Sequence, residues 1–148
     1  MEQIVVGIKL VGESAKVPIY KTARSSGADV YSAEEDFTLR PGESRMVHTG
    51  VYLQIPDGYE VQVRARSGLA YKHGITVLNG VGTIDSDYQG ECNVILVNHG
   101  SMPWVCRKGE RIAQFVLSPV VQAVFQGIID FAEETERGAG GFGSTGMQ

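Results

Sequence analysis

The sequence predicts an all-β fold, a sandwich or barrel of short strands with one short helix. Apolar and polar residues alternate with a period of two in successive stretches, which is typical of strands with one buried face. Turn sequences containing proline and glycine separate these stretches at short intervals. A chain of 148 residues with 43% hydrophobic residues is long enough to form one domain with its own core.

The clearest predicted strand is YEVQVRAR, residues 59–66, in which apolar residues alternate with Glu, Gln and Arg. It follows Pro56-Asp57-Gly58, a turn in which proline presets φ and glycine accepts a positive φ. Before that turn, RMVHTGVYLQI is predicted to bury every second residue from Val47 to Ile55. Further strands are predicted at IVVGIKL, ECNVILV, RIAQFVL and AVFQGII, and another turn at Arg40-Pro41-Gly42-Glu43.

Two other segments carry candidate binding groups. SGLAYKHG, residues 67–74, is predicted to be a short helix with Ser67 as its N-cap and glycine at its end. With Arg66 before it, this segment offers a guanidinium, a hydroxyl and an open backbone to an anion. Residues 78–98 are predicted to form a hairpin in which Gly80 and Gly82 permit close approach of the backbone.

The stretch CNVILV is apolar on both faces, whereas a small sandwich has only one interior. A homo-oligomer would cover the second face in every copy. A second layer within the same subunit is the alternative explanation.

Composition excludes several classes of partner. The net charge of −4 argues against a general nucleic-acid or anionic-membrane surface. No apolar stretch approaches the ~20 residues of a membrane span, and MEQIVVGIKL lacks the features of a signal peptide, so a cytoplasmic protein is expected. Cys92 and Cys106 are expected to be buried free thiols, and the three histidines have no metal-ligand spacing.

The chain ends on RGAGGFGSTGMQ, which matches the Walker A spacing but has Ser144 in place of the lysine. Too few residues follow Thr145 to form the helix that a phosphate loop requires, so that interpretation is unfavourable. A disordered glycine-rich end is the simplest alternative. A charge, an aromatic ring and two hydroxyls on a flexible ribbon are also what a lid over a phosphorylated aromatic ligand needs.

Five motifs in order resemble those of the trimeric dUTPase family across nearly the whole chain: SSGADVYSAEE, RARSGLAYKHGI, NGVGTIDSDYQGE, KGERIAQFV and RGAGGFGSTG. The resemblance implies a jelly-roll-like β-barrel that forms homotrimers. It implies hydrolysis of dUTP to dUMP and pyrophosphate with Mg2+, at sites shared between subunits. It also implies a barrel core over residues 1–136 and a flexible lid over residues 137–148.

The resemblance also implies a role for each matching residue. Asp85 corresponds to the catalytic acid that activates water, and Asp29 to an acid that contacts the metal through water. Tyr88 corresponds to the ring that lies against the deoxyribose, and Phe142 to the ring that stacks on uracil. The implied uracil reader is Asn79 with the backbone around Thr83, Ile84 and Asn93. The other implied substrate contacts, mainly to phosphate, are Arg66, Ser67, Gly68, Gln114, Arg137, Gly143, Ser144 and Thr145.

Two other functions are alternatives to this one. A deaminase of dCTP shares the fold, but it requires base chemistry at C4 and would release ammonia. A nucleotide-binding module without turnover would not need to keep the acid, the arginines and Gln114 together.

Overall fold

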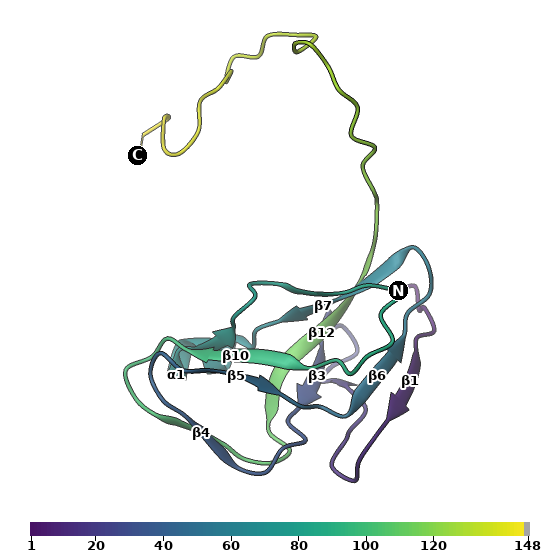
Figure 1. The fold of residues 1–148 in the computed structure, drawn as a ribbon, viewed down its shortest axis with the longest axis vertical. Coiled ribbons are helices and arrows are strands. Elements are labelled where there is room, and N and C mark those ends of the chain that lie inside the picture. The colour runs from purple at the N-terminus through teal and green to yellow at the C-terminus, as the bar shows by residue number, and fades with distance from the viewer. Residues whose placement is uncertain (147–148) are drawn as a thin grey trace.

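The computed structural model describes residues 1–146, which form short strands and one helix (Figure 1). One sheet has five strands in the order β2-β3-β12-β7-β9, and another has three in the order β5-β10-β8. Two further pairs are β1-β6 and β11-β4. The elements are β1 (Gly7–Leu10), β2 (Ile19–Tyr20), β3 (Ala28–Tyr31), β4 (Phe37–Leu39), β5 (Ser44–Val47), β6 (Val51–Gln54), β7 (Tyr59–Arg64), α1 (Ser67–His73), β8 (Ile75–Val77), β9 (Gly82–Ile84), β10 (Val94–Asn98), β11 (Trp104–Cys106) and β12 (Arg111–Pro119).

These four sheets surround one apolar core, and they do not join into a closed barrel within residues 1–146. The fold is therefore mostly β with one short helix, as the sequence predicts. Cys92 and Cys106 lie in the core as free thiols, also as predicted. Burial raises the pKa of Cys92 to about 11 and that of Cys106 to about 12, so both remain protonated at neutral pH.

The predicted alternation is confirmed in the clearest strand and in its neighbour. Val61 and Val63 of β7 face the core, while Arg64 is exposed. The stretch before it buries Val47, Thr49, Val51 and Ile55, although the strand is interrupted at residues 48–50 between β5 and β6. Both predicted turns are present: the Tyr59 amide donates to the Pro56 carbonyl at 3.2 Å, and the Glu43 amide to the Arg40 carbonyl at 2.9 Å.

Three local predictions are wrong. Ser67 is the first helical residue rather than the cap, because the N-cap position is Arg66 and no side chain caps it. Residues 78–98 do not pair with themselves as a hairpin, because β9 pairs with β7 whereas β10 pairs with β5 and β8. AVFQGII forms no strand, and its residues are exposed. In the last two cases the partner segment decides the pairing, and the local pattern does not specify that partner.

The second face of β10 is largely covered within the same chain. Val94 and Leu96 are fully buried, and Val97 on the other face is only 4% exposed. Ile95, on the same face as Val97, is half-buried, so a layer within the subunit covers part of this face. The homo-oligomer stays a prediction.

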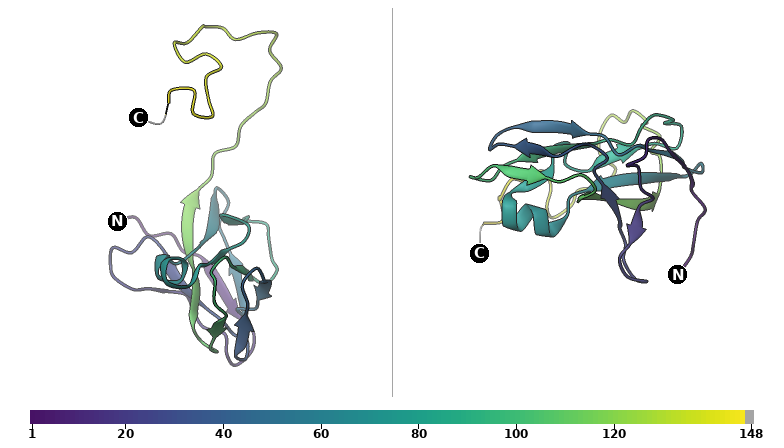
Figure 2. Two further views of the ribbon diagram at one scale, coloured as in Figure 1. Left: turned by 90° about the vertical axis from the view of Figure 1, so that its left-hand side faces the viewer. Right: turned by 90° about the horizontal axis from the view of Figure 1, so that it is seen from below.

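Beyond β12 the chain leaves the core as a long arm, which Figures 1 and 2 show reaching away from the sheets. Residues 120–139 are all exposed, including large apolar side chains such as Val121 at 95% and Phe125 at 96%. Among residues 1–146, no helix has the length and apolar character that a membrane span requires.

Candidate active site

Most of the predicted uracil and sugar contacts line one hollow of about 220 Å³. The edge strand β9 supplies Thr83 and Ile84, and the loop that follows it supplies Asp85 and Tyr88. Gly82 lies so close to Val63 and the Asn79 amide that a Cβ there would be only 3.0 Å from each. The predicted residues that line this base hollow are Asn79, Thr83, Ile84, Asp85, Tyr88 and Asn93.

Glu91 connects this hollow to the corner between β5 and β6. Its carbonyl accepts hydrogen bonds from the Tyr88 hydroxyl at 2.9 Å and from the Asn93 amide N–H at 3.1 Å. Its carboxylate accepts from the Gly50 amide at 2.8 Å and pairs with His48 Nδ1 at 2.8 Å. Gly90 allows the Tyr88 ring to fold back in this way, because a Cβ at residue 90 would collide with the ring.

A second hollow, of about 330 Å³, gathers the predicted phosphate contacts of the core. Arg66, Ser67 and Gly68 line it at the junction of β7 and α1, and Gln114 lines it from β12. Gln114 Nε2 donates to the Ala65 carbonyl at 2.9 Å, so its side chain braces the backbone just before Arg66. Gly27 makes room for that side chain, because a Cβ there would overlap it.

Asp29 also lines this phosphate hollow, where it is only 14% exposed. One carboxylate oxygen lies 3.3 Å from Arg66 Nε and the other 3.0 Å from Arg111 Nη1. Arg111 and Lys21 were not among the residues predicted from the sequence, although both line the hollow. Arg111 lies within the KGERIAQFV motif, but nothing in the strand alternation indicates that it shares a face with Gln114.

The structure does not bring the two hollows together within one chain. Strands β7 and β9 are antiparallel, and Ile84 lies opposite Val61, so the next residue, Asp85, lies near Glu60 at the start of β7. Arg66 lies beyond the other end of β7, which is Arg64. A strand rises by about 3.3 Å per residue, so the two groups are separated by roughly 20 Å. Asp85 and Arg66 of the same chain therefore cannot contact the same phosphate.

The tail residues are separate from both hollows. Arg137 Nε donates to the Gly140 carbonyl at 2.8 Å, and Phe142 is fully exposed with a positive φ of 52°. A hollow within the tail is lined only by residues between 135 and 145, among them the predicted contacts Arg137, Phe142, Gly143, Ser144 and Thr145. Met147 and Gln148, the last residues of the predicted lid, lie outside the described residues.

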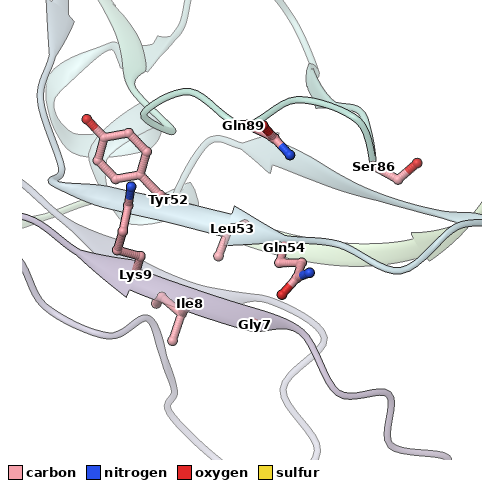
Figure 3. Close-up of a pocket in the computed structure, with 8 residues that line it drawn as sticks. All are labelled: Gly7, Ile8, Lys9, Tyr52, Leu53, Gln54, Ser86 and Gln89. Atoms are coloured by element: carbon pink, nitrogen blue, oxygen red, sulfur yellow. The ribbon is translucent and has the colours of Figure 1, made fainter.

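A further hollow, of about 440 Å³, lies on the β1-β6 ladder and contains none of the predicted site residues. In Figure 3, Ser86 and Gln89 lie across β6 from β1. The hollow therefore borders the loop that carries Asp85. Among the residues that line this hollow, the Lys9 ammonium lies 4.5 Å from the centroid of the Tyr52 ring, which is a cation–π contact.

The His48–Glu91 pair gives the base hollow a support that depends on pH. The hydrogen bond to Glu91 raises the pKa of His48 above its ordinary value of 6.5, with smaller effects from Glu34 and Arg45. Burial raises the pKa of Glu91, but the bonds from His48 and Gly50 outweigh it and leave the pKa below 4.5. The pair therefore contributes fully to the stability of the fold between pH 4.5 and 6.5, the ordinary pKa values of Glu91 and His48. This contribution falls as the pH rises through the raised pKa of His48 in the folded protein.

We expect His48→Ala to lower the melting temperature at pH 6 and to have a smaller effect at pH 9. The effect is small even at pH 6, because His48 is half exposed and water screens the pair. Thermal unfolding of both proteins at the two pH values, in the same salt, tests this. In a Glu91→Gln background the difference between pH 6 and pH 9 should vanish. An equal decrease of the melting temperature at both pH values would show that the charge on His48 does not contribute to stability.

Comparison with known proteins identifies the family of the chain. The family model described as dUTPase matches residues 13–146. The deoxyuridine 5'-triphosphate nucleotidohydrolase of Nautilia profundicola is 54% identical over 141 residues, covering 94% of this chain and 96% of that protein. The enzyme of the same name from a Wolbachia of Drosophila simulans is 52% identical over 137 residues, covering 91% of this chain and 90% of that protein.

A solved structure shows the same fold. The dUTPase of Staphylococcus bacteriophage 80alpha with dUpNHpp superposes with a TM-score of 0.89 at 27% identity, and the match covers 98% of this chain and all of that chain. With the family model spanning most of the sequence and curated relatives above 50% identity over nearly its full length, this chain belongs to the dUTPase family.

Proposed function

We propose that this chain is a dUTP diphosphatase, a hydrolase that converts dUTP to dUMP and pyrophosphate in the cytoplasm. The observation that carries the proposal is the pair of hollows: one gathers Asp85 with groups suited to a base and sugar, the other gathers arginines and hydroxyls suited to phosphate. Hydrolysis lowers dUTP, which keeps uracil out of DNA, and supplies dUMP for the synthesis of dTMP.

Uracil would enter the base hollow beside β9. The hollow is lined by Thr83, Ile84 and Asn93, whose backbone donors and acceptors would pair with the edge of a pyrimidine, and a narrow fit there would exclude a 5-methyl group. Asn79 supports this hollow, and Tyr88 would lie against the deoxyribose. Specificity is then steric as well as polar.

Asp85 would hold and activate the attacking water. Water needs a base because it is a poor nucleophile toward a phosphorus atom surrounded by negative oxygens. Asp85 is exposed at the rim of the base hollow, where a water could lie between it and a bound triphosphate. Arg66, Ser67, Gly68 and Gln114 would bind the triphosphate, and charge-assisted hydrogen bonds would fix its orientation.

Mg2+ fits this site only if the triphosphate supplies most of its ligands. No group of three His, Cys, Asp or Glu residues within the described chain could hold a metal, and both oxygens of Asp29 already face guanidinium groups. Mg2+ keeps several waters and favours substrate phosphates, so Asp29 would contact it through water. When bound, the ion would neutralise charge on the triphosphate.

We further propose a homotrimer with sites shared between subunits, in which a jelly-roll-like core of residues 1–136 carries a lid of residues 137–148. The roughly 20 Å between Asp85 and Arg66 supports shared sites, since the acid and the phosphate contacts of one site would come from different chains. The exposed apolar arm also supports a partner chain, because Val121, Phe125 and Ile129 have no cover in their own subunit.

Release of pyrophosphate from dUTP, dTTP, dCTP and UTP, measured side by side, tests the proposed function. We expect dUTP to be hydrolysed far faster than the other three. Ammonia release from dCTP would indicate the deaminase instead. Tight dUTP binding without release of pyrophosphate would indicate a non-catalytic nucleotide-binding module.

Tyr88→Ala is expected to narrow the preference for dUTP over UTP. The ring is held by its hydrogen bond to the Glu91 carbonyl, and a ribose 2'-hydroxyl would collide with it. Most of the change should come from a slower dUTP reaction, because packing against the deoxyribose is lost. The ratio of kcat/KM for the two nucleotides measures this, with Tyr71→Ala on the exposed face of α1 as the matched control. An unchanged ratio would place the steric selection elsewhere.

A further inference from the structure

A β-bulge in β12 brings Arg111 into the phosphate hollow. Residues at odd separations in a regular strand point to opposite faces, so Arg111 and Gln114 should face apart. The register shifts between them: Arg111 pairs with Tyr31 and Ala113 with Val30, which leaves Ile112 as the extra residue. Bulges of this kind redirect side chains and occur frequently beside active sites.

The partner strand shows the effect directly. Arg111 and Gln114 are paired with Tyr31 and Asp29, which are two residues apart on β3 and therefore share one face. Ile112 is 1% exposed in the core, so the inserted residue is fixed by packing. Arg111 is thereby held on the same side as Gln114 and beside Asp29, and both arginine and glutamine line the phosphate hollow.

Arg111 contacts the surroundings of Arg66 at two points. Its side chain donates to Asp29, the carboxylate that also pairs with Arg66 Nε. Its backbone carbonyl accepts a hydrogen bond from Arg66 Nη1 at 3.3 Å. A guanidinium has five N–H donors, so these contacts fix the plane of Arg66 and leave its remaining N–H groups for a ligand.

The charges of Asp29, Arg66 and Arg111 also indicate a role for Arg111. Asp29 shared by Arg66 and Arg111 leaves one net positive charge on these three groups, to which Lys21 in the same hollow adds another. Without Arg111, Asp29 and Arg66 would form a neutral one-to-one pair, and the carboxylate would compete with any phosphate for Arg66. Because the pair lies in a partly buried hollow, such competition is screened less than it would be at an open surface.

Resting on the function proposed above, we propose that Arg111 is a positioning residue for the phosphate hollow. It shares Asp29 with Arg66, and so keeps Arg66 oriented and available to the anionic end of the substrate. Arg111 acts through Arg66 and Asp29 in this role, and its placement depends on the bulge at Ile112.

The test compares ligands for the two hollows in the full-length protein without Mg2+. Arg111→Met should weaken pyrophosphate binding, measured by calorimetry, by about ten- to a hundredfold, the loss expected when a charged hydrogen-bonding group loses its orientation. Binding of 2'-deoxyuridine, which has base and sugar but no phosphate, should be unchanged in an NMR titration. Arg107→Met is the matched control, because Arg107 pairs with Asp36 outside the hollow.

A second substitution distinguishes positioning from direct contact. If Arg111 acts by sharing Asp29, then Asp29→Asn combined with Arg111→Met should bind pyrophosphate more tightly than Arg111→Met alone, since the competing carboxylate is gone. Should Arg111→Met prevent folding, Arg111→Gln serves in the same comparison, because it removes the charge but keeps a donor for Asp29.

Three results would overturn the proposal: unchanged pyrophosphate binding in Arg111→Met, no recovery in the double variant, or an equal loss of deoxyuridine binding. The last result would indicate a general structural role. A wild-type protein that binds pyrophosphate but releases none from dUTP would contradict the proposed function while leaving this test valid.

Discussion

Asp85→Asn is expected to lower turnover of dUTP by roughly 10²- to 10⁴-fold, the usual cost of losing a general base. Asparagine has nearly the same shape as aspartate but cannot accept a proton from water at neutral pH. Asp85 is exposed and takes part in no ion pair within residues 1–146, so the change should disturb neither the fold nor the base hollow. The Kd for a non-hydrolysable dUTP analogue should therefore remain close to that of wild type.

Asp87→Asn is the matched control, since Asp87 is an exposed acid in the same loop that does not line the base hollow. Single-turnover rates for both variants separate chemistry from product release. If Asp85→Asn turns over dUTP at nearly the wild-type rate, Asp85 is not the base.

Removal of residues 137–148 is expected to leave a folded core with little activity. We expect the core not to depend on these residues, because β12 ends at Pro119 and every residue from 120 to 139 is exposed. Ordering a backbone costs about 1–2 kcal/mol per residue, and more for glycine. The lid should therefore order only when Arg137, Ser144 and Thr145 bind phosphate oxygens and Phe142 stacks on the base.

The sharper form of this prediction is complementation between chains. A variant without the tail and an Asp85→Ala variant, each nearly inactive, are unfolded and refolded together so that subunits mix. Some mixed trimers then contain a site with an intact Asp85 and a tail from a neighbour. Release of pyrophosphate from dUTP should partly return.

The matched control replaces the Asp85→Ala partner with a chain that lacks both Asp85 and the tail, for which no activity should return. A tag on one variant shows whether mixed trimers form. Mixed trimers without recovered activity would mean that the tail does not act on a neighbouring subunit.

Residue types and local spacing were enough to predict the all-β class, the turns at Pro56-Asp57-Gly58 and Arg40-Pro41-Gly42-Glu43, and the family. The strands and turns depend on neighbours within a few positions: alternation decides which face of β7 is buried, and proline with glycine decides where the chain turns. The five ordered motifs also identified several of the groups that line each hollow, but not Arg111, Lys21 or Glu91.

Other features depend on contacts between segments far apart in the sequence. The stretch from Leu78 to Asn98 has the local pattern of a hairpin, yet its strands pair with β7, β5 and β8. AVFQGII has the pattern of a strand, but it has no partner strand within residues 1–146. A strand requires hydrogen bonds to another segment, and its own residues do not specify which segment that is.

The sequence by itself therefore determined the all-β class and the local turns, and its motifs supplied the candidate residues for the chemistry. Only the tertiary structure decided how those residues are divided between two distant hollows, and that Arg111 faces the phosphate side. The physical reason is register: one unpaired residue, Ile112, reverses the direction of every side chain before it relative to those after it, and this insertion is visible only in the pairing of β12 with β3.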